Sequence, residues 1–101
     1  MKIILTTCKS KQSSEIALKL LEEKLAACVT TISGARSRFL WNGEIQVEEE
    51  KQLIIKTSDE MVDKALSRII EIHPYDIPEV LVITPEQVSE NYLNWINESV
   101  N

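Results

Sequence analysis

The fold is decided by the stretch CVTTISGARSRFLWNGEIQVEEEKQLIIKT, from Cys28 to Thr57. Two β-type runs, Cys28–Trp41 and Glu44–Thr57, flank the dipeptide Asn42-Gly43. Asn-Gly in this place is the strongest short signal for a hairpin, because a type I′ turn needs positive φ at both central residues. Gly34 interrupts the outgoing run and indicates a bulge or bend. We therefore predict a long antiparallel hairpin in the middle of the chain.

The predicted hairpin is long for a chain of this size. Each arm has about 14 residues and spans roughly 45 Å at ~3.3 Å per residue, whereas a compact chain of about 100 residues has a radius of gyration of only about 13 Å. The hairpin must therefore bend sharply within its own domain or project beyond it. A projecting arm exposes apolar side chains and unpaired edges, which further copies of the chain would cover. The projecting alternative predicts a closed homo-oligomer with Phe39 and Trp41 at its interface.

The residues before the hairpin predict one strand and one helix. Lys2–Cys8 is apolar and β-type, so we expect a strand. Residues 9–14 are rich in Ser, Lys and Gln and are expected to form a loop. Ile16, Leu20 and Leu25 then recur at helical spacing, which predicts a helix of about 14 residues.

The residues after the hairpin predict a helix, a strand and a final helix. Thr57 and Glu60 have the spacing of a capping box, and the helix they start must stop by His73-Pro74. Residues 79–84 are apolar without alternation, which predicts a strand buried on both faces, and residues 88–100 favour a weaker helix. The order βαββαβ plus a helix predicts one ferredoxin-like domain, residues 1–101, with both main helices on one face of the sheet.

Composition excludes several classes of protein. The chain has 101 residues, 44% of them hydrophobic and 27% charged, and a net charge of −5. An acidic chain repels phosphate backbones, so we expect no nucleic-acid partner. No run approaches the ~20 apolar residues that span a membrane, and the first residues do not resemble a signal peptide. Two cysteines, Cys8 and Cys28, are too few for a disulfide scaffold, so we expect reduced thiols in a cytoplasmic protein.

His73 is the only histidine and stands in a stiff loop, His73-Pro74-Tyr75-Asp76-Ile77-Pro78-Glu79. An imidazole there is suited to a metal ligand or a proton shuttle. The alternative, which this residue by itself favours, is a hydrogen bond to a carbonyl at the end of a helix. Cys8 and Cys28 with His73 would make a three-ligand copper or zinc site. Their spacing matches no zinc motif, however, and both thiols are also compatible with simple burial.

Lys56 is the candidate anion ligand, because it precedes a predicted helix start. The alternative is an edge lysine that extends toward solvent. Glu50 is expected on a charged edge strand, or paired with Lys56 or Arg36 of a neighbouring chain. No nucleophile, base and orienting group stand at a recognisable spacing, and there is no glycine-rich phosphate loop. We therefore expect a protein that is not an enzyme.

Five motifs occur in order along nearly the whole chain: Lys24-Leu25-Ala26-Ala27-Cys28-Val29, Ser37-x-Phe39-x-Trp41-x-Gly43, Glu50 with Leu53-Ile54-Ile55-Lys56-Thr57, His73-Pro74-Tyr75-x-x-Pro78-Glu79, and Tyr92-Leu93-x-Trp95. Together they resemble the CutA family of divalent-cation tolerance proteins. The resemblance implies a ferredoxin-like fold and a homotrimer similar to PII-class signal-transduction proteins. It also implies a role in the response to heavy-metal ions, with copper and other divalent ions as ligands and no required cofactor.

The resemblance also implies roles for individual residues. His73 and Cys28 match positions implicated in metal binding. Trp41, Glu50, Lys56 and Tyr75 match positions that cluster near the cleft between subunits. The sequence departs from the family at Cys8, where a proline is usual. No family cysteine lies in the first strand, where residues 3–5 are Ile, Ile and Leu, and this absence weakens a site with two thiols.

Three functions remain open from the sequence. The first is a trimer that weakly binds divalent metal ions, copper among them, through His73. The second is a PII-like sensor or regulatory trimer that binds a small anionic ligand in the cleft between subunits. The third is a trimeric scaffold for an unidentified protein partner.

Overall fold

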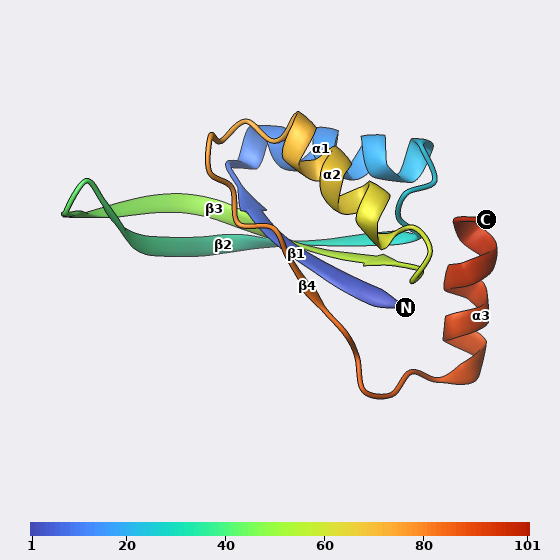
Figure 1. The fold of residues 1–101 in the computed structure, drawn as a ribbon. Coiled ribbons are helices and arrows are strands. Elements are labelled where there is room, and N and C mark those ends of the chain that lie inside the picture. The colour runs from blue at the N-terminus through green and yellow to red at the C-terminus, as the bar shows by residue number, and fades with distance from the viewer.

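A computed structural model describes residues 1–101. Its elements are β1 (Lys2–Cys8), α1 (Ser10–Glu22), β2 (Cys28–Trp41), β3 (Glu44–Thr57), α2 (Val62–Ile72), β4 (Leu81–Ile83) and α3 (Glu90–Ser99). The four strands form one antiparallel sheet in the order β2-β3-β1-β4. Helices α1 and α2 cover the same face of that sheet (Figure 1). The predicted ferredoxin-like βαββαβ order with an added C-terminal helix is confirmed.

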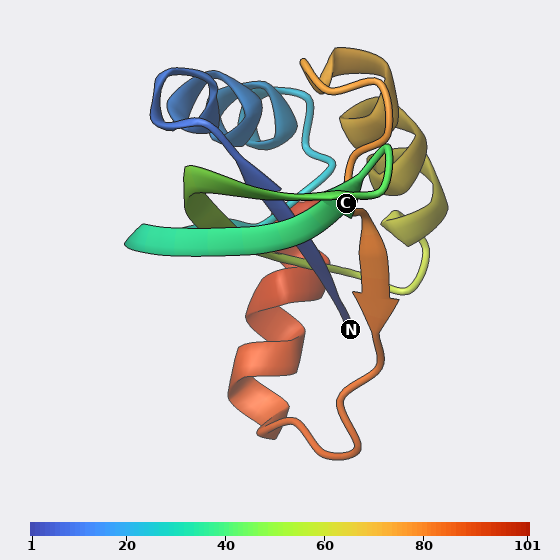
Figure 2. The same ribbon diagram turned by 90° about the vertical axis from the view of Figure 1, so that its left-hand side faces the viewer.

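The β2–β3 hairpin projects well beyond the rest of the molecule (Figure 1), and in Figure 2 it points toward the viewer. Its turn has positive φ at both central residues, +52° at Asn42 and +78° at Gly43, as predicted. The molecule measures 45 × 26 × 22 Å, and the hairpin runs along the longest of these dimensions. The projecting alternative is therefore the one that the structure adopts. The bulge is confirmed as well, because the β2–β3 register shifts between Ile32 and Ala35.

The core lies between the sheet and the two helices α1 and α2. Alternate strand residues such as Ile4, Leu53 and Ile55 point toward the helices and are fully buried. They meet the apolar stripes of the helices, represented by Leu20 of α1 and Ile69 of α2. Burying one such side chain stabilises the fold by about 1.5–3 kcal/mol. The apolar residues at helical spacing and the alternate apolar residues of the strands therefore pack in one core.

Two local predictions before the helices are wrong. Residues 9–14 do not form a loop, because α1 already begins at Ser10. The Ser13 hydroxyl, which could have competed with helix formation, instead donates to the Ser10 carbonyl at 2.9 Å. Thr57 caps no helix, because its hydroxyl donates to the Leu25 carbonyl at 2.7 Å. The Ser58 hydroxyl accepts from the Met61 N–H instead.

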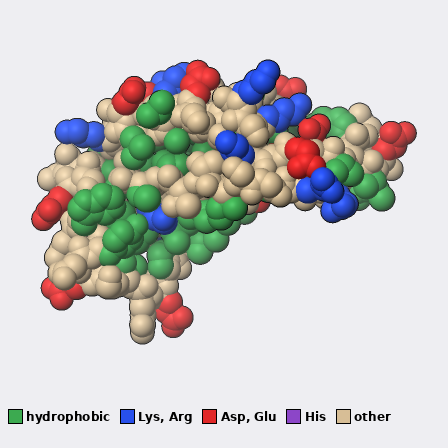
Figure 3. All heavy atoms as spheres, turned by 180° about the vertical axis from the view of Figure 1, so that it is seen from behind, with side chains coloured by type: hydrophobic (Ala, Val, Ile, Leu, Met, Phe, Trp, Pro, Cys, Tyr) green, Lys and Arg blue, Asp and Glu red, His purple; other side chains and the backbone are tan.

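The prediction that residues 79–84 form a strand buried on both faces is also wrong. β4 contains only Leu81–Ile83 and lies at the edge of the sheet, and its side chains are 40–42% exposed. Val82 lies beside Ile4 on the face toward the helices, whereas Leu81 and Ile83 lie on the opposite face, so this edge strand is open on both faces. Seen from behind, hydrophobic side chains gather on the body of the molecule, and a smaller group lies at the hairpin end (Figure 3). The exposed large hydrophobic residues of the sheet include Ile32, Leu81, Val82 and Ile83.

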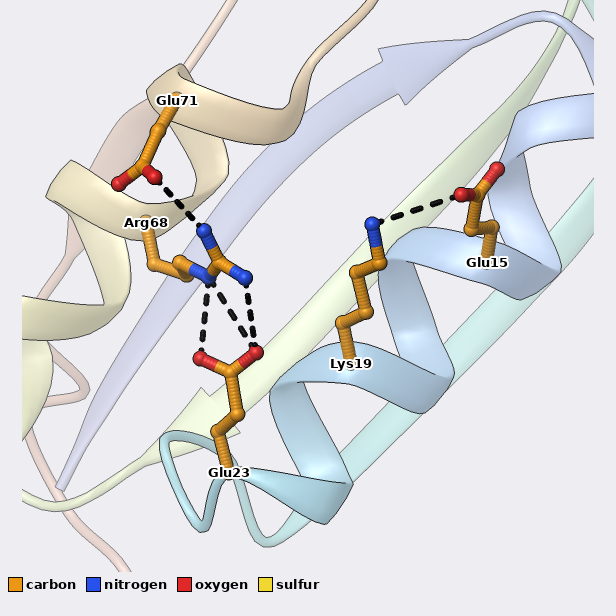
Figure 4. A network of polar contacts seen from close by, with 5 residues as sticks. All are labelled: Glu15, Lys19, Glu23, Arg68 and Glu71. Atoms are coloured by element: carbon orange, nitrogen blue, oxygen red, sulfur yellow. Dashed lines mark hydrogen bonds and ion pairs between the residues drawn. The ribbon is translucent and has the colours of Figure 1, made fainter.

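Polar contacts tie the two main helices together at the surface. Arg68 of α2 donates to both carboxylate oxygens of Glu23, just after α1, and to Glu71 one turn further along its own helix (Figure 4). Helix α3 lies at the end of the sheet opposite the hairpin tip, where Ile96 is fully buried. None of the three helices has the length and hydrophobicity needed to cross a membrane.

Candidate functional site

The candidate site is a cleft of about 680 Å³ between the projecting hairpin and the loop that follows α2. Side chains of a strand alternate between its two faces, so every second residue of β3 points the same way. Gln46, Glu48, Glu50 and Gln52 occupy four such positions and line the cleft. The hairpin therefore presents a polar, acidic row to the cleft.

The bulge at Gly34 places the aromatic residues of β2 on the same side as this row. On β2 and β3, two residues between Ile32 and Ala35 face one residue between Gln52 and Glu50. The extra residue reverses the alternation of β2, because side-chain direction repeats every two residues. Phe39 and Trp41 consequently line the cleft. A hairpin without the bulge would turn both aromatic side chains to the opposite face.

His73 holds in place the loop after α2, which forms the wall of the cleft opposite the hairpin. Its side chain is 7% exposed, its Nε2 lies 2.9 Å from the Thr7 carbonyl oxygen, and its Nδ1 accepts from the Tyr75 N–H at 3.1 Å. A carbonyl oxygen only accepts and an N–H only donates, so these partners assign the ring hydrogen to Nε2. The Tyr75 ring packs against the imidazole with centroids 4.7 Å apart. Both ring nitrogens of His73 are thus occupied within the chain.

Tyr75 and Glu50 form the central contact of the cleft. The Tyr75 hydroxyl donates to Oε2 of Glu50 at 2.7 Å, which joins the loop to β3. Burial, together with the hydrogen bond to Glu50 and the charge of its carboxylate, raises the pKa of Tyr75 well above its usual value. The phenol therefore remains a hydrogen-bond donor throughout the physiological pH range.

The cleft carries an excess of negative charge. Four carboxylates line it, those of Glu48, Glu50, Asp76 and Glu79, against the single ammonium of Lys9. Lys9 already lies 3.8 Å from Glu48. The other three carboxylates have no cation within 4.0 Å in the chain. The electrostatics of the cleft therefore favour a cation and disfavour an anion.

The structure brings together three of the predicted cleft residues, Trp41, Glu50 and Tyr75. Lys56 is separated from them: it is six residues from Glu50 along β3, or about 20 Å. Its ammonium donates to the Thr30 hydroxyl at 3.0 Å and lies 3.8 Å from the Cys28 sulfur. Lys56 also precedes α2 by six residues, so it does not lie at a helix start.

The two predicted metal ligands, His73 and Cys28, are not brought together within one chain. Cys28 stands beside Lys56 on β3, whereas His73 bonds to Thr7, which stands beside Gln52. The chain contains no group of three metal-ligating side chains around one point. Metal binding at either residue stays a prediction.

Cys8 lies near the cleft but belongs to the core. It is fully buried, and burial together with the nearby Glu50 charge raises the pKa of its thiol. Cys8 pairs with Lys51 and Cys28 with Lys56, so the two cysteines are five residues apart along β3. That separation is about 17 Å, far beyond the roughly 7 Å that a disulfide spans between Cα atoms. The two thiols do not meet within one chain.

Sequence reasoning missed Gln46, Glu48 and Gln52, which share the cleft face with Glu50. Their even spacing along β3 was a usable signal, because residues two apart share a face. The acidic residues of the loop, Asp76 and Glu79, were noted, but nothing in the sequence indicated that the loop faces the hairpin.

Comparison with known proteins identifies the family of the chain. The family model described as "CutA1 divalent ion tolerance protein" matches residues 2–99. The chain belongs to the CutA1 family. Its relative in Yersinia pestis, named "Divalent-cation tolerance protein CutA", is 37% identical over 99 residues, which cover 97% of this chain and 83% of the relative.

Solved structures of CutA1 family members have the same fold. The structure of CutA from Xylella fastidiosa is 37% identical to this chain with a TM-score of 0.96, and the match covers 99% of this chain and 97% of that one. The PII-like protein CutA from Nostoc, solved in its apo form, is 32% identical with a TM-score of 0.95 and coverage of 100% and 98%. The expected CutA resemblance and PII-like fold are confirmed.

Proposed function

We propose that this CutA1 protein is a non-enzymatic, cytoplasmic homotrimer that weakly binds divalent metal ions, copper among them, and acts in the response to such ions. One observation carries the proposal: Glu50 is 6% exposed and its carboxylate has no cation within 4.0 Å in the chain. Buried charges in proteins are normally paired or bound to a metal. The name of its relatives, divalent-cation tolerance proteins, supports the same role.

The candidate ligands fall into two groups. Glu50, with Asp76 and Glu79 in the same cleft, offers the carboxylate oxygens that hard divalent ions prefer. His73 and Cys28 offer the imidazole and thiolate that suit copper. His73 would have to give up one of its two hydrogen bonds to bind a metal. A site assembled from so few groups of one chain leaves positions for water or for a second chain, and this favours weak binding.

The uncovered apolar surface supports the trimer. Leu40 and Ile45 beside the hairpin turn are each 74% exposed, and the face formed by Ile32, Leu81 and Ile83 has no helix over it. Contiguous apolar surface of this kind marks interaction sites. Further copies of the chain would cover both regions, with Phe39 and Trp41 near the contact.

Calorimetric titration tests the metal proposal. Metal-free protein is titrated with Cu(II) and Zn(II), as wild type and as Glu50→Gln, His73→Gln and Cys28→Ser. We expect saturable binding that Glu50→Gln weakens at least about tenfold, equivalent to ~1.4 kcal/mol. An unchanged affinity in Glu50→Gln with a loss in His73→Gln or Cys28→Ser would move the site to those residues. Binding no tighter than about 1 mM in wild type would contradict the proposal.

The second candidate function is a PII-like sensor or regulatory trimer. The TM-score of 0.95 with the PII-like CutA from Nostoc supports this class of function. An anionic ligand is less well supported, because carboxylates outnumber ammonium groups four to one in the cleft and Lys56 lies outside it. A role as a scaffold for a protein partner has no single residue in its favour.

A further inference from the structure

The projecting part of the hairpin has two different faces. Side chains alternate along each strand, and the bulge places Phe39 and Trp41 on the face that lines the cleft. The other face, the outer face of the hairpin, carries one free cation among three apolar side chains: Arg38, Leu40, Ile45 and Val47. The three apolar residues are 52–74% exposed. The outer face is therefore a surface that a partner would stabilise by covering it.

Arg38 is the one cation in residues 35–50 that has no acidic partner. Arg36 pairs with Glu49, the only carboxylate of the outer face, at 2.6 Å. Arg38 is exposed and forms no ion pair in the chain. Because the cleft carboxylates of β3 point to the opposite face, Arg38 cannot reach those of its own chain. An acidic partner for Arg38 must come from another molecule.

The cleft matches the outer face in charge and in apolar surface. It presents Phe39 and Trp41 beside four carboxylates and a single ammonium, whereas the outer face presents aliphatic side chains around a guanidinium. A guanidinium forms bidentate hydrogen bonds with a carboxylate and stacks on aromatic rings, so Arg38 suits both parts of the cleft. Arginine and aromatic side chains also carry much of the binding free energy of protein interfaces. Two surfaces that match but cannot meet within one chain favour contact between copies.

A contact of this kind is heterologous, because the outer face of one copy meets the cleft of the next. Heterologous contacts close into a ring where the rotation between copies allows it, and a ring of three is the trimer proposed above. The hairpin projects beyond the body of a molecule 45 Å long (Figure 1), so it is the element best placed to reach a neighbour.

We propose that a second copy of the chain completes the cleft: Arg38 of one copy enters the cleft of the next and pairs with Glu50. Glu50 is 6% exposed and has no cation within 4.0 Å in its own chain. A buried carboxylate of this kind is stabilised by a paired cation. The inference rests on the proposed trimer and names the residue that one copy contributes to the site of the next.

The test measures how readily the trimer dissociates, by fluorescence-detected sedimentation in EDTA, with urea added in steps if dilution alone does not dissociate wild type. Arg38→Glu changes an exposed side chain without contacts in its own chain, so the circular dichroism spectrum should be unchanged. We expect it to dissociate at a chain concentration at least about tenfold higher than wild type. Lys64→Glu makes the same charge change at an exposed, unpaired residue of α2 and should stay within about twofold of wild type.

A double-mutant cycle tests the named pair. Arg38→Gln and Glu50→Gln should each weaken the trimer, and the double variant should be no weaker than the weaker single variant, because no pair is left to break. Additive losses would overturn the inference, since the two side chains would then act at separate places. An Arg38→Glu protein as firmly trimeric as wild type would overturn it too. A wild-type protein with the mass of one chain at every concentration would reject the proposed trimer itself.

Metal titration of Arg38→Gln separates this inference from the metal proposal. A guanidinium and a divalent ion compete for the Glu50 carboxylate, so we expect Cu(II) and Zn(II) to bind Arg38→Gln more tightly than wild type. Absence of metal binding in both proteins, together with a weakened Arg38→Gln trimer, would reject the metal proposal and support the intersubunit pair.

Discussion

The Tyr75 hydroxyl donates a 2.7 Å hydrogen bond to Oε2 of Glu50, which joins the loop after α2 to the root of the projecting hairpin. Tyr75 is itself held by His73, whose Nδ1 accepts from the Tyr75 N–H. Because His73 Nε2 bonds to the Thr7 carbonyl, four residues form one chain of contacts from β1 to β3: Thr7, His73, Tyr75 and Glu50. The cleft keeps its shape because this chain fixes its two walls relative to each other.

Removing the hydroxyl should weaken the fold. Tyr75→Phe leaves Oε2 of a buried carboxylate without its donor, and we expect the free energy of unfolding to fall by about 1–3 kcal/mol. Urea denaturation measures this change. Tyr92→Phe is the matched control, because the Tyr92 hydroxyl makes no hydrogen bond in the chain, and it should stay within about 0.5 kcal/mol. Equal stability of the two variants would show that the Tyr75–Glu50 bond contributes nothing.

The raised pKa of Tyr75 predicts a loss of stability in alkali. In the unfolded chain the phenol loses its proton near about pH 10, whereas in the folded chain it keeps the proton to higher pH. Above about pH 10 the unfolded state therefore binds fewer protons, and the free energy of unfolding falls as pH rises. The contribution of Tyr75 is complete below that pH. Between about pH 9 and about pH 11, wild type should lose more stability than Tyr75→Phe, and parallel curves would contradict the assignment.

Gly34 should be the sensitive position of the bulge. Its φ is +84°, and a Cβ added there would meet nothing within 4 Å, so the cost of Gly34→Ala is in the backbone alone. We expect a loss of about 1–2 kcal/mol in the free energy of unfolding. Ser33→Ala, the neighbouring change without a positive φ, should cost less. A Gly34→Ala protein as stable as wild type would mean that the bulge relaxes into another conformation.

Cys8 should resist thiol reagents in the native protein. Its side chain is fully buried and its pKa is raised by burial and by Glu50, so little thiolate forms near pH 8. Iodoacetamide labelling followed by mass spectrometry should leave Cys8 unmodified until urea is added. Labelling of native Cys8 at the rate of the unfolded chain would contradict its place in the core. An oxidant should form no Cys8–Cys28 disulfide within one chain.

Trp41 should contribute to the proposed trimer. Sedimentation equilibrium of wild type should give three times the chain mass of 11.5 kDa. Truncating a packed aromatic side chain costs about 3–5 kcal/mol, so Trp41→Ala should dissociate at concentrations where wild type stays assembled. Leu18→Ala, at an exposed position on α1, is the control and should leave the assembly intact. A Trp41→Ala protein that stays trimeric at nanomolar concentration would remove Trp41 from the interface.

Local sequence patterns predicted the structure correctly wherever a single short-range signal acted. Asn42-Gly43 predicted the turn, His73-Pro74 the end of α2, and Gly34 the bulge, because each depends on the conformations of a few neighbouring residues. Competing signals were harder to separate. Thr57 has the residue type and the spacing from Glu60 of a helix cap. Its hydroxyl instead donates to the Leu25 carbonyl, which is distant in sequence and therefore absent from any local pattern.

The sequence by itself determined the order of the strands and helices, the long hairpin and the CutA family, since these follow from periodicity, turn chemistry and motif order. Only the tertiary structure decided which residues meet. It placed the Tyr75 hydroxyl against Glu50. It also placed Lys56, with Cys28 beside it, about six residues from Glu50 along β3, and it left β4 exposed at a sheet edge. The physical reason is that strand register and a single extra residue at Gly34 set the side-chain faces. These depend on pairing between segments far apart in the chain.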